Sequence, residues 1–177
     1  MELKVLKTDQ STPGQAEPWY AKGLQFTCSQ CGNCCTGPTG YVWISKEEIQ
    51  RLATHLKLTP GQVINQYCRR VSGKYSLKEH RNERGEYDCI FLKEEKVDKG
   101  NGDHVVHTKR ICTIYPVRPL QCRTWPFWSE NLRNIDIWNR SGVRCHGINH
   151  GSRVFTKEQI EALRDSKDWP QNPPTSG

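Results

Sequence analysis

The sequence has little of what a large hydrophobic core or a membrane span requires. Its 177 residues are 34% hydrophobic, a fraction that already counts cysteine and tyrosine, and they include one methionine. No stretch approaches the roughly 18 apolar residues of a bilayer-spanning helix, and residues 1–10 lack the apolar centre of a signal peptide. We therefore expect a soluble, cytoplasmic chain without a membrane partner, whose fold is stabilised partly by something other than hydrophobic burial.

Recognisable catalytic patterns are also missing. No Ser/His/Asp arrangement, phosphate-binding loop or pair of carboxylates stands out, so the sequence assigns no catalytic residue and does not decide whether the protein is an enzyme. The formal charge of +7 is typical of proteins that bind nucleic acid. However, eight thiolates with two divalent ions would reduce it to about +3. The basic residues are therefore interpreted as compensation for an anionic metal site, and nucleic acid is the disfavoured partner.

Cysteine, in contrast, is abundant, with nine in the chain. In a reducing compartment, clustered cysteines serve as metal ligands or redox centres more often than they form disulfides. Four of them lie within eight residues: Cys28, Cys31, Cys34 and Cys35. A CxxC turn directs two sulfurs at one metal, and Gly32 after the second cysteine supplies the positive φ that such a turn often needs.

The other candidate ligands lie downstream, each after an expected strand end or in a proline-bounded turn: Cys89, Cys112, Cys122 and Cys145. Eight thiols predict two four-thiolate sites. Because adjacent sulfurs rarely fit one tetrahedral centre, Cys34 and Cys35 are expected to serve different metals, or one of them bridges or stays free for chemistry. The pairing of the remaining cysteines with the two sites stays open. Cys68 is expected on a helix as a buried apolar residue and not as a ligand.

The identity of the metal is not decided by the spacing. Cys28-x2-Cys31-x2-Cys34 matches the first three ligands of the bacterial ferredoxin run, which favours iron in a [4Fe-4S] cluster. Four-thiolate sites suit zinc equally well in softness and geometry. Zinc and iron therefore both remain candidates.

The combined pattern resembles the CxxCxxCC cysteine-cluster family, described as a zinc- or iron-chelating domain. The resemblance covers about residues 24–150 and rests on CxxCGxCC at 28–35, CIFL at 89–92, C-x-IYPxRPxxCRxxPF at 112–127 and C-x-G at 145–147. It implies metal binding by the eight cysteines, without a settled activity. Some longer relatives are flagellin lysine N-methylases, but this sequence shows no recognisable methyl-donor loop, which places methyl transfer in doubt.

Local patterns predict a small single α+β domain with short helices, hairpins and many loops, pinned by the metal-binding cysteines. Residues 1–22 are expected to be a loosely ordered lead-in, 23–169 the metal-binding domain and 170–177 a disordered Pro-rich tail. Capping boxes predict helices starting at Ser45, Thr59 and Thr156, the second ending near Arg70 and the third reaching toward Trp169. The other expected elements are a strand at 40–44, a hairpin around 82–85, a turn at 99–103, helical turns within 117–125 and a strand at 134–138.

Several residues near the cysteines have two interpretations. Arg118 and Arg123 flank Cys122 and either bind a substrate anion or, as we favour, stabilise the negative metal site. Asp88, beside Cys89, is a candidate to support a ligand through a hydrogen bond. The aromatic residues from Tyr115 to Trp138 are expected to shield the site and fill a thin core, although they could form a stacking surface. The functional alternatives to a metal-binding protein are thus an iron-dependent redox or group-transfer enzyme and a zinc-stabilised RNA- or protein-binding adaptor.

Overall fold

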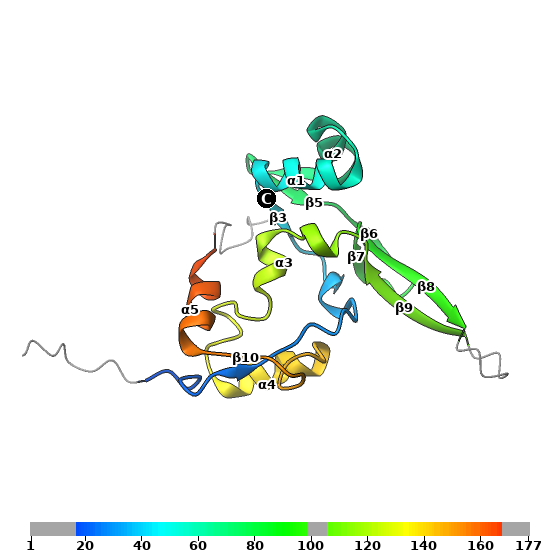
Figure 1. The fold of residues 1–177 in the computed structure, drawn as a ribbon. Helices are drawn as coiled ribbons and strands as arrows, with labels where there is room; N and C mark the ends of the chain where they lie inside the picture. Colours follow the sequence, from blue (N-terminus) through cyan, green and yellow to red (C-terminus); the bar gives the residue numbers. More distant parts are fainter. Residues whose placement is uncertain (1–16, 99–105, 168–177) are drawn as a thin grey trace, which may run out of the picture.

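The computed structural model describes residues 17–98 and 106–167. In these ranges the chain forms five short α-helices and several small antiparallel sheets, which confirms the α+β class (Figure 1). The helices are α1 Lys46–Leu56, α2 Pro60–Tyr67, α3 Leu120–Thr124, α4 Ile135–Arg144 and α5 Lys157–Asp165, with 3-10 turns η1 Asn33–Cys35 and η2 Tyr115–Val117. The predicted turn at 99–103 and Trp169 lie outside the described residues.

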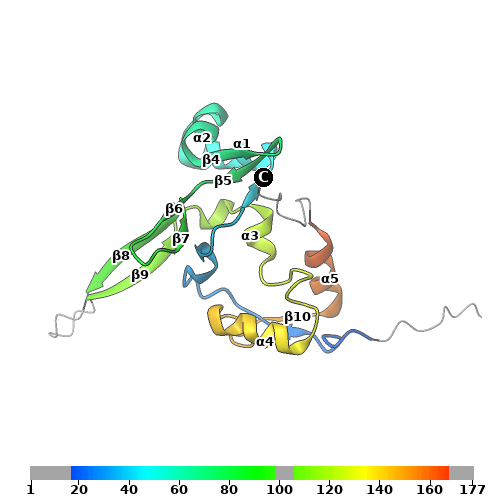
Figure 2. The ribbon, with the colours of Figure 1, turned by 180° about the vertical axis from the view of Figure 1, so that it is seen from behind.

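The strands are short and pair in four groups: β1 Leu24–Gln25 with β10 Val154–Phe155; β2 Thr36–Gly37 with β7 Tyr87–Cys89 and β6 Glu79–Arg81; β3 Trp43–Ile44 with β5 Lys74–Leu77 and β4 Cys68–Val71; and β8 Leu92–Asp98 with β9 Val106–Cys112. The β8–β9 hairpin projects away from the rest of the molecule in both views (Figures 1 and 2). Its base lies beside the body of the fold, where Leu92 is paired with Cys112. This pairing holds Cys112 next to the end of β7, which carries Cys89.

Three helix starts follow from local hydrogen bonding, as the sequence predicts. Ser45, Thr59 and Thr156 each accept a hydrogen bond from the backbone N–H three residues on, and the Glu or Gln at that position returns one. The predicted hairpin around Asn82–Gly85 is also confirmed, with β6 and β7 as its strands. These elements are determined by residues a few positions apart.

Two predicted elements are wrong. The second helix ends at Tyr67 instead of near Arg70, because Cys68 to Val71 leave the helix to pair with β5 through a turn in which Ser72 and Gly73 have positive φ. Cys68 therefore begins a strand and is not helical. The expected strand at 134–138 is the start of α4: the Asn134 side chain accepts the Ile137 N–H at 2.9 Å and caps the helix, which places the buried Trp138 one turn in.

Two hydrophobic cores divide the molecule. The first joins the N-terminal segment to α4, β10 and α5 around Phe127 and Trp138, and it includes Tyr20 from the expected N-terminal lead-in. The second lies beneath α1, α2 and β5, around Leu52 and Val63. In both ribbon views these parts lie at opposite ends, with α3 between them (Figures 1 and 2). Cys28 and Cys145 belong to the side of the first core and Cys89 and Cys112 to that of the second, so the cysteines lie between the two.

Glu48 ties α1 to the start of α3, the helix that carries Cys122. Its buried carboxylate accepts the Leu120 N–H at 2.6 Å and the Ser45 N–H at 3.0 Å, and Arg123 lies 3.7 Å away. Glu48→Gln retains the shape but turns an amide NH2 toward one of these donors. We expect a loss of about 1–3 kcal/mol in the free energy of unfolding, the typical cost of an unsatisfied buried donor, measured by chemical denaturation.

The matched control for Glu48→Gln is Glu95→Gln on the exposed part of the β8–β9 hairpin. This substitution removes the same charge without a buried partner, and we expect no measurable change in unfolding. Equal stability of the two variants would contradict a role for Glu48 in fixing α3.

Candidate metal centre

The cysteine loop runs from the end of β1 to β2 and is shaped by Gly32. This glycine has φ +72° and precedes the 3-10 turn that carries Cys34 and Cys35, as the sequence predicts. A Cβ at this position would lie 2.8 Å from Leu92 Cδ1 and 2.9 Å from Arg110 Cβ. Glycine is therefore needed both for the backbone conformation and for the close packing of the loop against the base of the β8–β9 hairpin.

Cys35 links the loop to the hairpin through its thiol. Its Sγ lies 3.7 Å from that of Cys34, and the thiol also interacts with that of Cys112 at the end of β9. These interactions with Cys35 are the main reason why the pKa of Cys34 and that of Cys112 are both lowered to about 7, and the positive charge of Arg118 adds to the effect. The pKa of Cys35 itself is raised, first by its interactions with Cys112 and Cys34 and then by burial.

Cys89 and Cys122 complete a group of thiols around Cys35. Burial is the main cause that raises the pKa of Cys89 to about 11, and burial also raises the pKa of Cys122 well above its usual value. Both groups are further affected by negative charge on Cys34 and Cys112, so these thiols lie within electrostatic range of one another. We call Cys34, Cys35, Cys89, Cys112 and Cys122 the five-thiol group.

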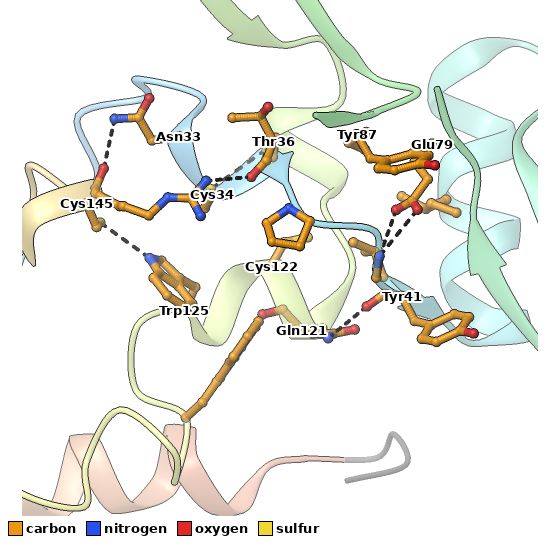
Figure 3. A pocket seen from close by; sticks show the side chains of 18 of the residues that line it. Asn33, Cys34, Thr36, Tyr41, Glu79, Tyr87, Gln121, Cys122, Trp125 and Cys145 are labelled. Atoms are coloured by element: carbon orange, nitrogen blue, oxygen red, sulfur yellow. Dashed lines mark hydrogen bonds between the residues drawn. The ribbon is translucent and has the colours of Figure 1, made fainter. Parts of the chain in front are cut away.

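Of the remaining three predicted ligands, Cys28 and Cys145 lie at the first core. Cys145 follows the last turn of α4, where its Sγ accepts a hydrogen bond from Trp125 Nε1 at 3.3 Å (Figure 3). Burial raises its pKa despite that hydrogen bond, and Cys34 and Cys31 add to the shift. Cys28 borders the same core and interacts with the Tyr115 phenol. Cys145 thus lies between the cysteine loop and the core.

The thiols are gathered in one region but are not arranged as a finished coordination shell. Within residues 17–98 and 106–167, no three side chains among Cys, His, Asp and Glu are positioned to hold one metal ion. His146, which adjoins Cys145, is exposed. The chemistry of the donor set nevertheless fits zinc or iron, because soft thiolates suit both metals and a cation would compensate the charge of several thiolates that lie close together. The pKa values of Cys34 and Cys112 are both lowered, which favours the thiolate form that metal binding requires.

The neighbouring charged residues have distinct roles. Arg118 lies over the Tyr115 ring, 3.7 Å from its centroid, and favours the negative form of Cys34 and Cys112. Arg123 instead pairs with Glu48. Asp88 is buried and accepts a hydrogen bond from Asn82 Nδ2 at 2.9 Å, which fixes the β6–β7 turn. Arg118 is thus the residue whose charge acts on the thiols.

One set of contacts near the thiols has no signal in the sequence. Asn33 Nδ2 donates to the Arg144 carbonyl and Arg144 Nη2 donates to the Thr36 carbonyl, both at 2.8 Å. These bonds join the cysteine loop to the C-terminal end of α4 and so position Cys145. The partners are more than 100 positions apart, and neither residue type is diagnostic of such a contact.

Cys68 is a buried member of the second core, with 5% of its surface exposed, whereas Cys89 and Cys112 pack against that core and are only partly buried. The sequence-based interpretation as a buried apolar residue is confirmed, and burial raises the pKa of its thiol to about 11. Cys68→Ser should leave the metal content unchanged, measured by elemental analysis, while costing about 1–3 kcal/mol of stability because a hydroxyl replaces the thiol in an apolar site. Loss of a metal equivalent would show that Cys68 is a ligand after all.

The fold and its thiols define a small cysteine-rich domain with the donor chemistry of a metal chelator. Residues 27–146 match the sequence model of the CxxCxxCC family, described as "putative zinc- or iron-chelating domain", and the chain belongs to this family. It is also similar to the uncharacterized protein MJ0661 of Methanocaldococcus jannaschii, with 33% identity over 126 residues. That match covers 67% of this chain and 57% of the relative, so the chain spans little more than half the length of this relative.

No solved structure matches the chain. None of the helices in the described residues has the length and apolar character needed to cross a membrane. Family membership assigns the chain to a group of zinc- or iron-chelating domains and leaves the ligand set, the choice of metal and any activity to be derived from the residues.

Proposed function

We propose that the protein holds zinc or iron through eight cysteines, and that the five-thiol group forms the principal site. The observation that carries the proposal is the position of Cys35, whose Sγ lies 3.7 Å from that of Cys34 in its own loop and whose thiol interacts with that of Cys112 from β9. This arrangement brings together thiols from separate segments, and Cys89 and Cys122 lie within electrostatic range of them. Thiols that repel one another when ionised gain little from lying close together unless a cation compensates their charge, which supports a metal site here.

The three remaining cysteines support a second site or complete the first. Cys145 interacts electrostatically with both Cys31 and Cys34. Cys34 therefore connects the five-thiol group to the set formed by Cys28, Cys31 and Cys145. In a cluster of several iron ions, or in two neighbouring zinc sites, a shared or adjacent thiolate is the expected connection. The proposal therefore includes Cys28, Cys31 and Cys145 as ligands and leaves zinc and a [4Fe-4S] cluster as the two forms to be distinguished.

Metal analysis of anaerobically purified protein distinguishes these forms. A brown sample with broad visible absorbance and acid-labile sulfide would establish an iron–sulfur cluster, whereas a colourless sample with zinc would exclude it. With two separate sites, Cys31→Ser and Cys35→Ser should each lose about one of two metal equivalents. With a single centre, either variant should lose the whole metal content. Protein that binds neither metal tightly would refute the proposal.

A redox or group-transfer enzyme is the second candidate, and one observation favours it. A cavity of about 380 Å³ opens beside the thiols, with Cys34, Cys89 and Cys122 in its wall (Figure 3). A purely structural metal site is normally closed, whereas a catalytic site retains access for a substrate.

The adaptor alternative loses part of its basis, because Phe127 and Trp138 are buried in the first core and cannot form a stacking surface.

A further inference from the structure

The cavity beside the thiols has the size and lining of a site for an organic ligand. Its volume of about 380 Å³ lies within the range of small-molecule pockets, roughly 300–1,000 Å³. A metal ion needs much less space, since even a water molecule takes up about 30 Å³ of the liquid. The wall is formed by the cysteine loop, β7, α3 and the end of α4, and five of the predicted ligands lie in it.

Aromatic side chains line opposite sides of this cavity. Trp125 and Trp128 pack edge to face on one side, with ring centroids 4.9 Å apart. Tyr87 lies on the side opposite Trp125, with Cys122 between them in the view of Figure 3, whereas the nearby Tyr41 ring is stacked on Trp43 and lies under the Arg69 guanidinium. The indole N–H of Trp125 is bound to Cys145 and that of Trp128 to the Gln121 carbonyl. The indole rings therefore contribute mainly apolar surface, and such surface favours a flat aromatic molecule.

Arg144 supplies a positive charge at the edge of the cavity. Its Nη2 donates to the Thr36 carbonyl at 2.8 Å, and within the described ranges it forms no ion pair with any Asp or Glu. The other charged groups of the lining are engaged: Glu79 lies 3.6 Å from Arg69, and Lys78 Nζ donates to the Asn65 carbonyl at 2.7 Å. A guanidinium carries five donors in a planar fork, of which Arg144 has most left for a carboxylate.

The geometry points to a binding site for a planar aromatic carboxylate, with its ring between the tryptophans and Tyr87 and its carboxylate paired with Arg144. Five of the proposed metal ligands lie in the wall of this pocket, so a bound molecule would have direct access to a metal held by those thiols. The site thus assigns a class of ligand that neither the cysteine pattern nor the family description contains.

The test uses the full chain with its metal, titrated with 2-naphthoate and with the neutral 2-naphthamide by isothermal calorimetry. The parent protein should bind the carboxylate more tightly than the amide. Arg144→Gln should weaken binding of 2-naphthoate roughly tenfold or more, the typical effect of losing a hydrogen bond to a charged group, and should leave the amide unchanged. Tyr87→Leu should weaken both ligands, because it removes part of the aromatic wall.

Arg140→Gln is the matched control, since Arg140 lies on the same helix, is exposed and is not part of the cavity wall. It should leave both affinities unchanged. No saturable binding of 2-naphthoate, no preference for it over the amide in the parent protein, or equal losses in Arg144→Gln and Arg140→Gln would each overturn the inference. Metal analysis of the same samples separates the two proposals: metal without naphthoate binding refutes only the pocket, and naphthoate binding without metal refutes only the chelation.

Discussion

Cys35→Ser is expected to lose at least one equivalent of metal and to melt at a clearly lower temperature than the parent protein. Serine has nearly the same shape, but its hydroxyl is a hard and weakly acidic ligand that replaces a soft thiolate. Cys35 interacts with both Cys34 and Cys112, so the change removes the connection between the cysteine loop and β9. Loss of a residue that only hydrogen-bonds to a metal ligand weakens metal binding about 10–100-fold, and loss of a direct ligand should have a larger effect.

The effect on stability follows from the link between metal binding and folding. Structural zinc contributes about 10–16 kcal/mol of apparent binding free energy in small domains, and this energy also stabilises the fold. Elemental analysis and thermal melting, with and without added metal, measure both consequences. Cys68→Ser is the matched control, because it exchanges the same atoms at a cysteine in the second core. A Cys35→Ser protein with full metal content and unchanged melting would exclude Cys35 as a ligand.

The sequence predicted best those features that depend on neighbours along the chain. The capping boxes at Ser45, Thr59 and Thr156 require only residues three positions apart, and all three begin a helix as expected. The requirement for positive φ at Gly32 follows similarly from the local turn and is confirmed. Such signals are contained in a few residues, so tertiary contacts seldom override them.

The wrong predictions concern segments whose secondary structure depends on long-range strand pairing or on burial. Cys68 to Val71 could extend α2 by their local preference, but pairing with β5 converts them into a strand. Residues 134–138 alternate in polarity like a strand, yet the Asn134 cap and the burial of Trp138 in the first core favour a helix. Five residues are too few to separate a period of two from a helical period, and the surrounding core settles the outcome.

The organisation of the thiols was only partly predictable. The spacing of the first four cysteines indicated a metal site, but the interaction of Cys35 with Cys112 depends on how the β8–β9 hairpin meets the cysteine loop. The position of Cys145 depends in turn on the bonds of Arg144 and Asn33 across the fold. Assignment of the eight thiols to one or two centres therefore remains a prediction for the serine variants to test.

Trp138→Ala should have the largest effect of any single substitution away from the cysteines. The indole is 1% exposed, packs parallel to Phe127 with centroids 5.7 Å apart, and donates its N–H to Asn149 Oδ1 at 2.7 Å. Truncation of a buried tryptophan costs about 3–5 kcal/mol, a large part of the roughly 5–15 kcal/mol that stabilises a typical domain. Chemical denaturation of the metal-loaded protein measures this loss. Ile135→Ala, at a 55% exposed position of the same helix, should be nearly neutral.

The response to added metal should separate this core variant from the ligand variant. Trp138→Ala leaves all eight thiols in place, so excess zinc or iron should raise its melting temperature again, because a ligand that binds only the folded state shifts the unfolding equilibrium. Cys35→Ser lacks part of the binding site and should gain much less at the same metal concentration. If metal did not stabilise Trp138→Ala, formation of the metal centre would itself require an intact α4. The first core and the thiols that border it would then have to fold as one unit.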